Sequence, residues 1–237
     1  MKLTLRALAL LLGYPSEELK ANISEIRNAL ARERALSAPA LEQLEPLLRS
    51  YEDHDLLDLQ AGYSELFDRS RKLSLHLFEH VHGENRERGQ AMIDLAEQYA
   101  AAGFFLDSTE LPDFIPVFLE FSSCLPADQA REMLGQPSHV FAALAERLEE
   151  RDLRYASIFH AIIAAADARP EAEAVAELQE NAPDEDPSRI DEEWEEAPVT
   201  FMAGSAHEMG GPTGVVAKIR AANRAVDPSS KRQGEIG

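Results

Sequence analysis

Apolar residues recur along most of the chain at the three- and four-residue spacing of amphipathic helices. No stretch alternates apolar and polar residues as a half-buried strand would, so the pattern predicts an all-α fold. Helix-breaking segments separate the helical stretches. One example is Gly13-Tyr14-Pro15, which is followed by Ser16 as a suitable N-cap. We therefore expect a single bundle of about nine or ten helices, at about 3–12, 16–36, after Pro39, and at 56–67, 74–82, 84–102, 112–124, 127–134, 138–150 and 153–168.

The composition agrees with helices. The chain has 36 Ala and 30 Leu but only 8 Val and 10 Ile, a bias that favours helix over strand. One expected helix raises a question, because Pro116 lies beyond the first turn if that helix begins at Pro112. Proline inside a helix removes a backbone hydrogen bond. The helix therefore either begins later than Pro112 or is kinked.

The character of the chain changes at Arg169-Pro170. Residues 170–196 contain 12 acids and one base, and the last 40 residues add glycines rather than periodic apolar positions. Such a segment buries too little apolar surface to offset the entropy lost on ordering. We therefore predict a helical domain at 1–169 and an acidic, mostly disordered tail at 170–237. Within this tail, Trp194 with Val199 and Phe201 nearby is the part that could dock on the domain.

Charge and composition exclude several classes of function. With 43 acids and 23 bases the net charge is −20, which argues against binding along nucleic acid phosphates and favours cationic partners. The longest apolar runs, such as Ala7–Leu12, are far shorter than the roughly 20 residues of a membrane helix. A lone cysteine, Cys124, excludes an internal disulfide and suits a reducing compartment. We expect a cytoplasmic protein that does not insert into membranes, with Cys124 buried.

Catalytic and metal signatures are weak. The sequence has no G-x-S-x-G, no phosphate loop and no G-x-G-x-x-G motif, so we do not expect an enzyme. His76 and His80 are four residues apart and share a helix face, whereas His82 lies about 120° away at 100° per residue. Two ligands are fewer than the three or four that zinc requires. We predict no metal site, and a helical metalloenzyme that uses His76 and His80 is retained as an unfavoured alternative.

The stretch around Arg88 combines apolar and charged residues in a way that a plain core would not need. Arg88 shares a helix face with Met92, Leu95 and Tyr99, so its guanidinium should need an acidic or carbonyl partner. The simplest interpretation is a structural ion pair, or a side chain that lies along the apolar face with its guanidinium in solvent. Gly89 beside it costs roughly 1 kcal/mol relative to alanine, which suggests close helix packing.

The stretch around Pro112 places acidic residues beside apolar ones, an arrangement that could bind a peptide. Glu110 and Asp113 lie where the start of a helix favours negative charge, and Phe114, Val117 and Phe118 follow on an apolar face. A well-started core helix would explain these residues. The functional alternative is an acidic, irregular edge beside an apolar groove, suited to a peptide with basic and apolar residues.

Together these stretches resemble the nitrate reductase assembly chaperones, the NarJ family of the TorD/DmsD superfamily of redox-enzyme maturation proteins. Tyr63-x-x-Leu-Phe67 matches the superfamily signature aromatic-x-x-Leu-Phe, and Glu110-x-Pro-Asp113 matches its Glu-x-Pro-Asp signature. The run 74–92 and Ile190–Glu196 resemble the nitrate reductase branch more specifically. The resemblance covers about residues 3–201. The superfamily signature usually continues with histidine where this chain has Phe114, so the role of that histidine cannot be carried over.

The resemblance implies a TorD-like helical bundle without catalytic activity. Such a chaperone binds the N-terminal segment of the apo catalytic subunit of respiratory nitrate reductase and delays membrane attachment. It also assists insertion of the molybdenum cofactor (bis-MGD) without holding the cofactor stably. A chaperone for another molybdoenzyme, such as a dimethyl sulfoxide or trimethylamine oxide reductase, is the main alternative. The expected partner-binding residues are Tyr63, Phe67, His82, Arg86, Arg88, Glu110, Pro112, Asp113 and Glu120. Among them we expect Arg86, Arg88, Glu110 and Asp113 to be exposed contacts. Phe67, together with Met92 and Tyr99, should belong mainly to the core.

Overall fold

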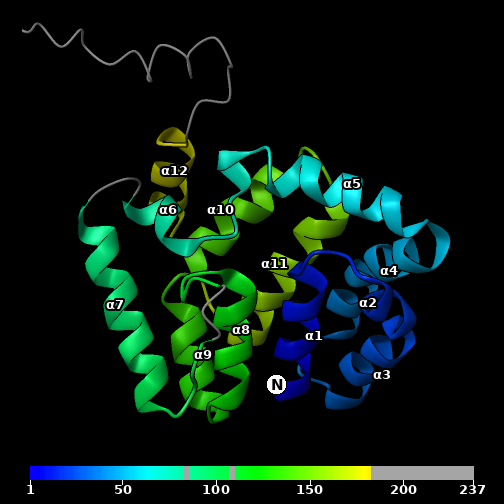
Figure 1. Ribbon diagram of the computed structural model, residues 1–237, viewed down its shortest axis with the longest axis horizontal. Coiled ribbons are helices and arrows are strands. Elements are labelled where there is room, and N and C mark those ends of the chain that lie inside the picture. Colours follow the sequence, from blue (N-terminus) through cyan, green and yellow to red (C-terminus); the bar gives the residue numbers. More distant parts are fainter. Residues whose placement is uncertain (83–85, 107–109, 183–237) are drawn as a thin grey trace, which may run out of the picture. The chain divides into compact units, whose positions relative to one another are not determined.

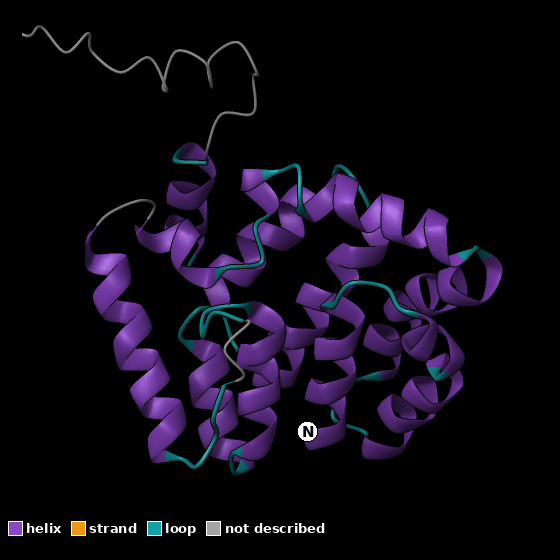
Figure 2. Cartoon of the chain, viewed as in Figure 1, coloured by secondary structure: helices purple, strands orange, loops and turns teal. Residues whose placement is uncertain are grey.

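The computed structural model describes residues 1–82, 86–106 and 110–182, which contain twelve α-helices, one short 3-10 helix and no strand (Figure 2). All of them belong to one compact unit, 1–192. The helices are α1 (Lys2–Leu12), α2 (Glu17–Ala21), α3 (Ile23–Glu33), α4 (Ala38–Asp53), α5 (Leu56–Phe67), α6 (Leu77–His82), α7 (Arg86–Ala101), α8 (Ile115–Cys124), α9 (Ala127–Gly135), α10 (Ser138–Glu149), α11 (Leu153–Ala166) and α12 (Ala172–Glu180), and the 3-10 helix η1 is Arg71–Leu73. The predicted all-α fold is confirmed.

Local chemistry explains where these helices begin and end. The hydroxyl of Ser16 accepts a hydrogen bond from the backbone N–H of Leu19 at 3.1 Å and so caps α2, as predicted. The single helix expected at 16–36 is instead two helices, α2 and α3. They separate at Asn22, whose side chain donates to the carbonyl of Glu18 at 2.8 Å. Asparagine interrupts helices because its amide competes with the backbone for such bonds.

The question raised by Pro116 is resolved by a late start. Helix α8 begins at Ile115 with Phe114 as its N-cap, so Pro116 falls in the first turn, where no backbone N–H is needed. The residues before it, 110–114, consequently form a loop. This loop runs beside the residues that precede α6, and the two segments meet at an isolated antiparallel bridge between His76 and Phe114.

Helix α11 lies at the centre of the bundle, where it packs against α10, α4, α9 and α1 (Figure 1). Most of its side chains are buried, including Phe159 and Ile162 at 0% exposure. Helix α1 in turn packs against α8 and α3. A continuous apolar core therefore joins the N-terminal and the C-terminal halves of the described chain.

Helix α12 lies inside the segment assigned by the sequence analysis to a disordered tail. It packs against α10, and its Val175 is buried. Gln179 fixes the contact because its amide donates to the carbonyl of Ala143 at 3.1 Å. The predicted boundary at 169/170 is thus too early by at least one helix, since an average over the acidic segment hides the apolar pair Val175 and Leu178 on one helix face. The remainder of the predicted tail, 183–237, lies outside the described residues.

Membrane insertion finds no support among the described helices, since none combines the length and the apolar character needed to cross a bilayer.

Candidate functional site

Asp113 organises the region where the two matched motifs, Tyr63–Phe67 and Glu110–Asp113, meet. Its side chain is 0% exposed. One carboxylate oxygen accepts a hydrogen bond from the backbone N–H of Phe78 at 3.1 Å, and the other lies 3.2 Å from Nδ1 of His76. Its backbone carbonyl accepts from the N–H of Leu77 at 3.0 Å. Asp113 therefore closes the N-terminus of α6, although it belongs to a loop 35 residues further along the chain.

This burial corrects one expectation. We expected Asp113 to be an exposed contact charge, but a carboxylate that is fully enclosed offers no surface to a partner. Any effect of Asp113 on binding must act through the position of α6. The neighbouring Pro112 is also buried, and its carbonyl accepts a hydrogen bond from the hydroxyl of Tyr99 at 2.8 Å.

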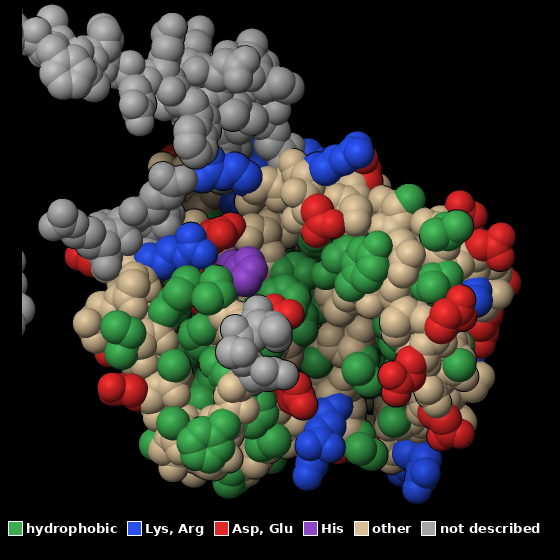
Figure 3. Space-filling model, viewed as in Figure 1, with side chains coloured by type: hydrophobic (Ala, Val, Ile, Leu, Met, Phe, Trp, Pro, Cys, Tyr) green, Lys and Arg blue, Asp and Glu red, His purple; other side chains and the backbone are tan. Residues whose placement is uncertain are grey.

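A cavity of about 430 Å³ lies beside this junction. We call it the aromatic pocket. It is lined by Gly13, Tyr14, Tyr63, Phe67, Asp68, Ser74, Leu75, His76, Glu110 and Phe114. Three of the predicted partner-binding residues, Tyr63, Phe67 and Glu110, thus share one pocket. On the face shown in Figure 3, hydrophobic side chains gather where α1, α5 and α8 approach one another.

The walls of the aromatic pocket are held rigidly by ring contacts. The ring of Tyr63 lies 4.8 Å from that of Phe67 and 5.4 Å from that of Tyr14, centre to centre. Phe67 also packs edge-on against Tyr155 of α11 at 5.2 Å, which connects the pocket to the central helix. On the opposite wall His76 lies 5.3 Å from Phe114. Such contacts favour a preformed apolar surface.

The aromatic pocket carries two carboxylates, those of Asp68 and Glu110. Asp68 and Glu110 are exposed, whereas Tyr63 is buried and its hydroxyl donates to the carbonyl of Leu12 at 2.9 Å. Burial raises the pKa of Tyr63, and the nearby carboxylates of Asp68 and Glu110 raise it further. Tyr63 therefore stays neutral and adds no charge to the two carboxylates.

The other predicted residues do not line the aromatic pocket. Arg88, at the start of α7, donates to the carboxylate of Glu79 on α6 at 3.1 Å, which is the structural ion pair that the sequence analysis favoured. It is half-buried rather than the exposed contact that we expected. Glu120 is exposed on α8, and the side chains of His82 and Arg86 lie outside the described residues. The structure thus divides the predicted surface into separate parts.

The histidine pair is engaged in hydrogen bonds. Nε2 of His80 lies 2.8 Å from the carbonyl of Ser74, and its Nδ1 lies 3.4 Å from the guanidinium of Arg147. This pairing makes Nε2 the protonated atom and Nδ1 the acceptor. Residues 1–82, 86–106 and 110–182 contain no group of three or more His, Cys, Asp or Glu side chains placed to hold a metal ion. The metalloenzyme alternative therefore gains no support from this part of the chain.

Two smaller expectations are wrong. Cys124 is exposed rather than buried, because it is the last residue of α8. Gly89 is also exposed, and a Cβ placed on it would meet nothing within 4 Å. Close packing against the described residues therefore does not explain that glycine.

Several pocket residues were missed by the sequence analysis. Tyr14 was treated only as punctuation after the first helix, and Asp68 only follows the matched aromatic signature. A signal is available for His76 and Phe114, since His76 lies inside the matched run 74–92 and Phe114 directly follows Glu110-x-Pro-Asp113. Their pairing depends on a bridge between distant loops.

Comparison with known proteins places the chain in a family. The profile of the family described as "Nitrate reductase delta subunit" matches residues 16–161. The nitrate reductase molybdenum cofactor assembly chaperone NarJ of Escherichia coli K12 is 43% identical over 194 residues, which are 81% of this chain and 82% of the relative. The probable chaperone NarW of the same organism is 40% identical over 204 residues, 85% of each chain. A probable NarJ of Bacillus subtilis is 32% identical over 171 residues, 69% of this chain and 88% of the relative.

A solved structure supports the fold independently. A putative redox enzyme maturation protein from Archaeoglobus fulgidus matches with a TM-score of 0.51 and 23% identity, over 68% of this chain and 91% of that one. At this identity the likeness concerns the fold alone. The family profile covers more than half of the chain, and the closely similar sequences cover most of it. The chain therefore belongs to the nitrate reductase delta subunit family, together with the NarJ and NarW proteins of Escherichia coli.

Proposed function

We propose that this protein is a non-catalytic, cytoplasmic assembly chaperone for respiratory nitrate reductase. Its client is the apo catalytic subunit, whose N-terminal segment it binds. Bound in this way, the client is kept from attaching to the membrane too early and remains open for insertion of the molybdenum cofactor. The names of the relatives, which are molybdenum cofactor assembly chaperones of nitrate reductase, support this role. The cofactor is cargo for the client and needs no stable site on this chain.

The aromatic pocket is the observation that carries the proposal. Its floor is apolar and held by Tyr63 and Phe67, and its exposed polar groups include the carboxylates of Asp68 and Glu110. The family resemblance implies a client segment that is basic and apolar, like the remnant of a twin-arginine signal. An apolar pocket with acidic groups complements such a segment in both respects.

Binding at this pocket can assist cofactor insertion only through differential affinity. A ligand shifts a conformational equilibrium by the difference between its affinities for the two states. We therefore infer that the chaperone binds the open, cofactor-accepting form of the catalytic subunit more tightly than the closed form. The N-terminal segment provides the anchor, and further contacts with the open form provide the difference.

Calorimetry of the full chain with the N-terminal peptide of the nitrate reductase catalytic subunit tests the proposal. We expect saturable binding to the parent protein, weakened by Glu110→Gln and by Asp68→Asn. The matched control is Glu132→Gln, because Glu132 is also an exposed acid but lies on α9. Because these three changes affect exposed side chains, each should leave the unfolding free energy within about 0.5 kcal/mol of the parent.

The same experiment separates the alternative clients. The corresponding peptides from dimethyl sulfoxide and trimethylamine oxide reductases should bind much more weakly than the nitrate reductase peptide. Tighter binding of either one would assign the chaperone to that enzyme. Equal binding by the parent protein and by the two pocket variants would place the client site elsewhere on the molecule.

A further inference from the structure

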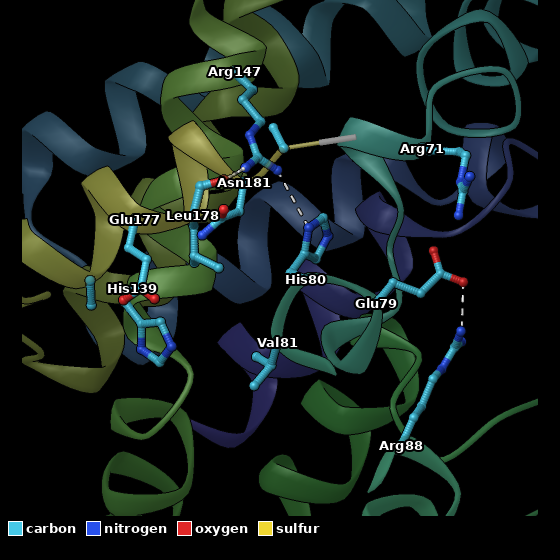
Figure 4. A pocket seen from close by; sticks show the side chains of 12 residues that line it. Arg71, Glu79, His80, Val81, Arg88, His139, Arg147, Glu177, Leu178 and Asn181 are labelled. Carbon is cyan, nitrogen blue, oxygen red and sulfur yellow. Dashed lines mark hydrogen bonds and ion pairs between the residues drawn. The ribbon is translucent and has the colours of Figure 1, made fainter. Parts of the chain in front are cut away.

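A second cavity, of about 550 Å³, opens where α6, α7, α10 and α12 approach one another (Figure 4). We call it the arginine pocket. It is lined by Arg71, Glu79, His80, Val81, Arg88, His139, Arg147, Ala174, Glu177, Leu178, Asn181 and Ala182. Three arginines and two histidines thus face two carboxylates, in a chain whose net charge is −20. Figure 3 shows Lys and Arg side chains gathered near α6 and α12, whereas Asp and Glu side chains are frequent over α2 to α5.

Two of the basic side chains, those of Arg147 and Arg88, are held in place by hydrogen bonds. Arg147 donates to the carbonyl of Lys72 at 2.9 Å and to the amide oxygen of Gln179 at 2.8 Å, so it joins α10 to η1 and to α12. Arg88 donates one terminal N–H to Glu79, while its Nε atom is buried without a hydrogen-bond partner. Figure 4 shows Arg71 and Arg88 on either side of Glu79. A guanidinium held in place favours a carboxylate or another anion, because its terminal N–H groups form a fixed set of donors.

The chain itself brings acids to this pocket. Asn181 and Ala182 line the cavity and are the last described residues, so the next part of the chain starts at its mouth. Residues 183–192 contain five acids, Asp184, Glu185, Asp186, Asp191 and Glu192, and one base, Arg189. Ten extended residues span up to about 33–36 Å, which is more than enough to cross a cavity of this size. Attachment at the rim also gives the segment an effective concentration on the order of millimolar.

We propose that the acidic segment 183–192 docks in the arginine pocket of its own chain, with carboxylates directed at Arg71 and Arg88. Docking covers the cluster of arginine and histidine side chains in the arginine pocket and excludes other anionic groups from it. It also adds contacts to α12, which otherwise packs mainly on α10. The aromatic pocket is separate and stays available, because no residue of the arginine pocket lines it. This inference does not depend on the identity of the client.

The full chain carries a natural reporter for this docking. Trp194 is the only tryptophan and lies two residues beyond the acidic segment, so quenching of its fluorescence by neutral acrylamide reports on its exposure. Hydrogen exchange of residues 183–192 provides a second, direct measurement. Both should be compared between the parent protein and a variant in which Asp184, Glu185 and Asp186 are changed to Asn, Gln and Asn. This variant leaves the walls of the arginine pocket intact.

We expect faster exchange at 183–192 and stronger quenching in the neutralised variant, and the same changes in the parent at about 0.5 M salt, where charges are screened beyond a few ångströms. The pocket variant Arg71→Glu should behave like the neutralised one, and Arg131→Glu, an exposed arginine on α9, is its matched control. Neutralising the exposed acids Glu42, Glu97 and Glu132 is the control for the triple change. If 183–192 exchanges as fast in the parent as in the neutralised variant, the proposal is wrong, whatever the quenching shows.

Discussion

Nδ1 of His76 lies 3.2 Å from a carboxylate oxygen of Asp113, and the other oxygen of that carboxylate accepts the backbone N–H of Phe78. One buried aspartate therefore fixes the start of α6 from a loop that precedes α8. Helix α6 has a different pocket at each side. His76, just before it, lines the aromatic pocket, while Glu79 and His80 within it line the arginine pocket. The position of both pockets thus depends on the same carboxylate.

Replacing Asp113 should destabilise the fold. In Asp113→Ala the N–H of Phe78 and the ring of His76 lose the buried carboxylate that they contact. A hydrogen bond to a charged group contributes roughly 1.5–3 kcal/mol, and the contact with His76 contributes less because that ring is 28% exposed, so we expect a total loss of about 2–4 kcal/mol. Urea unfolding measures this loss, and Asp113→Asn, which retains one acceptor oxygen, should lose less. The exposed Glu110→Ala is the control, and an Asp113→Ala protein as stable as that control would contradict the assigned capping role.

Replacing two exposed helical glycines should stabilise the fold, whereas replacing Asp113 should destabilise it. A Cβ at Gly89 in α7 or at Gly62 in α5 would meet nothing within 4 Å. Because glycine costs roughly 1 kcal/mol relative to alanine inside a helix, Gly89→Ala and Gly62→Ala should each raise the unfolding free energy by about that amount. Thermal unfolding with a fixed buffer and scan rate would show the gain. Destabilisation by either change would mean that the glycine meets a neighbour after all.

Periodicity predicts this fold well because the bundle consists of amphipathic helices with short connections. The expected helix at 56–67 coincides with α5, since its apolar residues recur at helical spacing. The failures have local causes. A single asparagine, Asn22, divides one predicted helix, and the apolar pair in α12 is obscured by the acids around it. Composition averages over a segment, whereas one helix turn needs only two well-placed apolar residues.

The candidate site is less predictable because tertiary contacts decide which charged residues are exposed. Glu110 and Asp113 are three residues apart and have the same charge, yet the first is exposed and the second is fully buried. The difference arises from the N-terminus of α6, a partner that is more than 30 residues distant in sequence. Motifs can therefore locate the region of the site, but not the orientation of each side chain within it.

His80 makes stability depend on pH. Burial lowers its pKa below the ordinary value, and the positive charge of Arg147 lowers it further. Between about pH 6.5, the ordinary imidazole pKa, and the lower folded value, the unfolded chain binds a proton that the folded chain does not. The contribution of neutral His80 to the unfolding free energy is thus fully present above about pH 6.5 and is lost as the pH falls toward the folded pKa. Urea unfolding between about pH 7.5 and 5.5 should show a weaker dependence in His80→Gln than in the parent. If the pH dependence of unfolding is unchanged in His80→Gln, His80 is not its source. The control is His160→Gln, because His160 is exposed.

Arg147 should hold α12 on the bundle. Arg147→Ala removes the bonds to the carbonyl of Leu178 and to Gln179, and leaves α12 to its contact with α10. A glutamate-specific protease should cleave slowly at Glu171 and Glu173 in the parent, so that its stable fragment includes α12 rather than ending near residue 170. Cleavage there should be faster in Arg147→Ala and unchanged in Arg131→Ala. Rapid cleavage of the parent at both positions would show that α12 is not held.

The last prediction concerns how the client arrives. Attraction between the carboxylates of Asp68 and Glu110 and a basic peptide acts at long range, whereas burial of apolar groups against Tyr63 and Phe67 begins only on contact. Salt should therefore slow association more than it speeds dissociation, because screening mainly weakens the long-range attraction. Stopped-flow measurements between about 0.05 and about 0.5 M salt can separate the two rates. The change in association rate should shrink in Glu110→Gln and persist in Glu132→Gln. An association rate that is independent of salt in the parent would remove the electrostatic part of the proposed recognition and leave apolar burial as its basis.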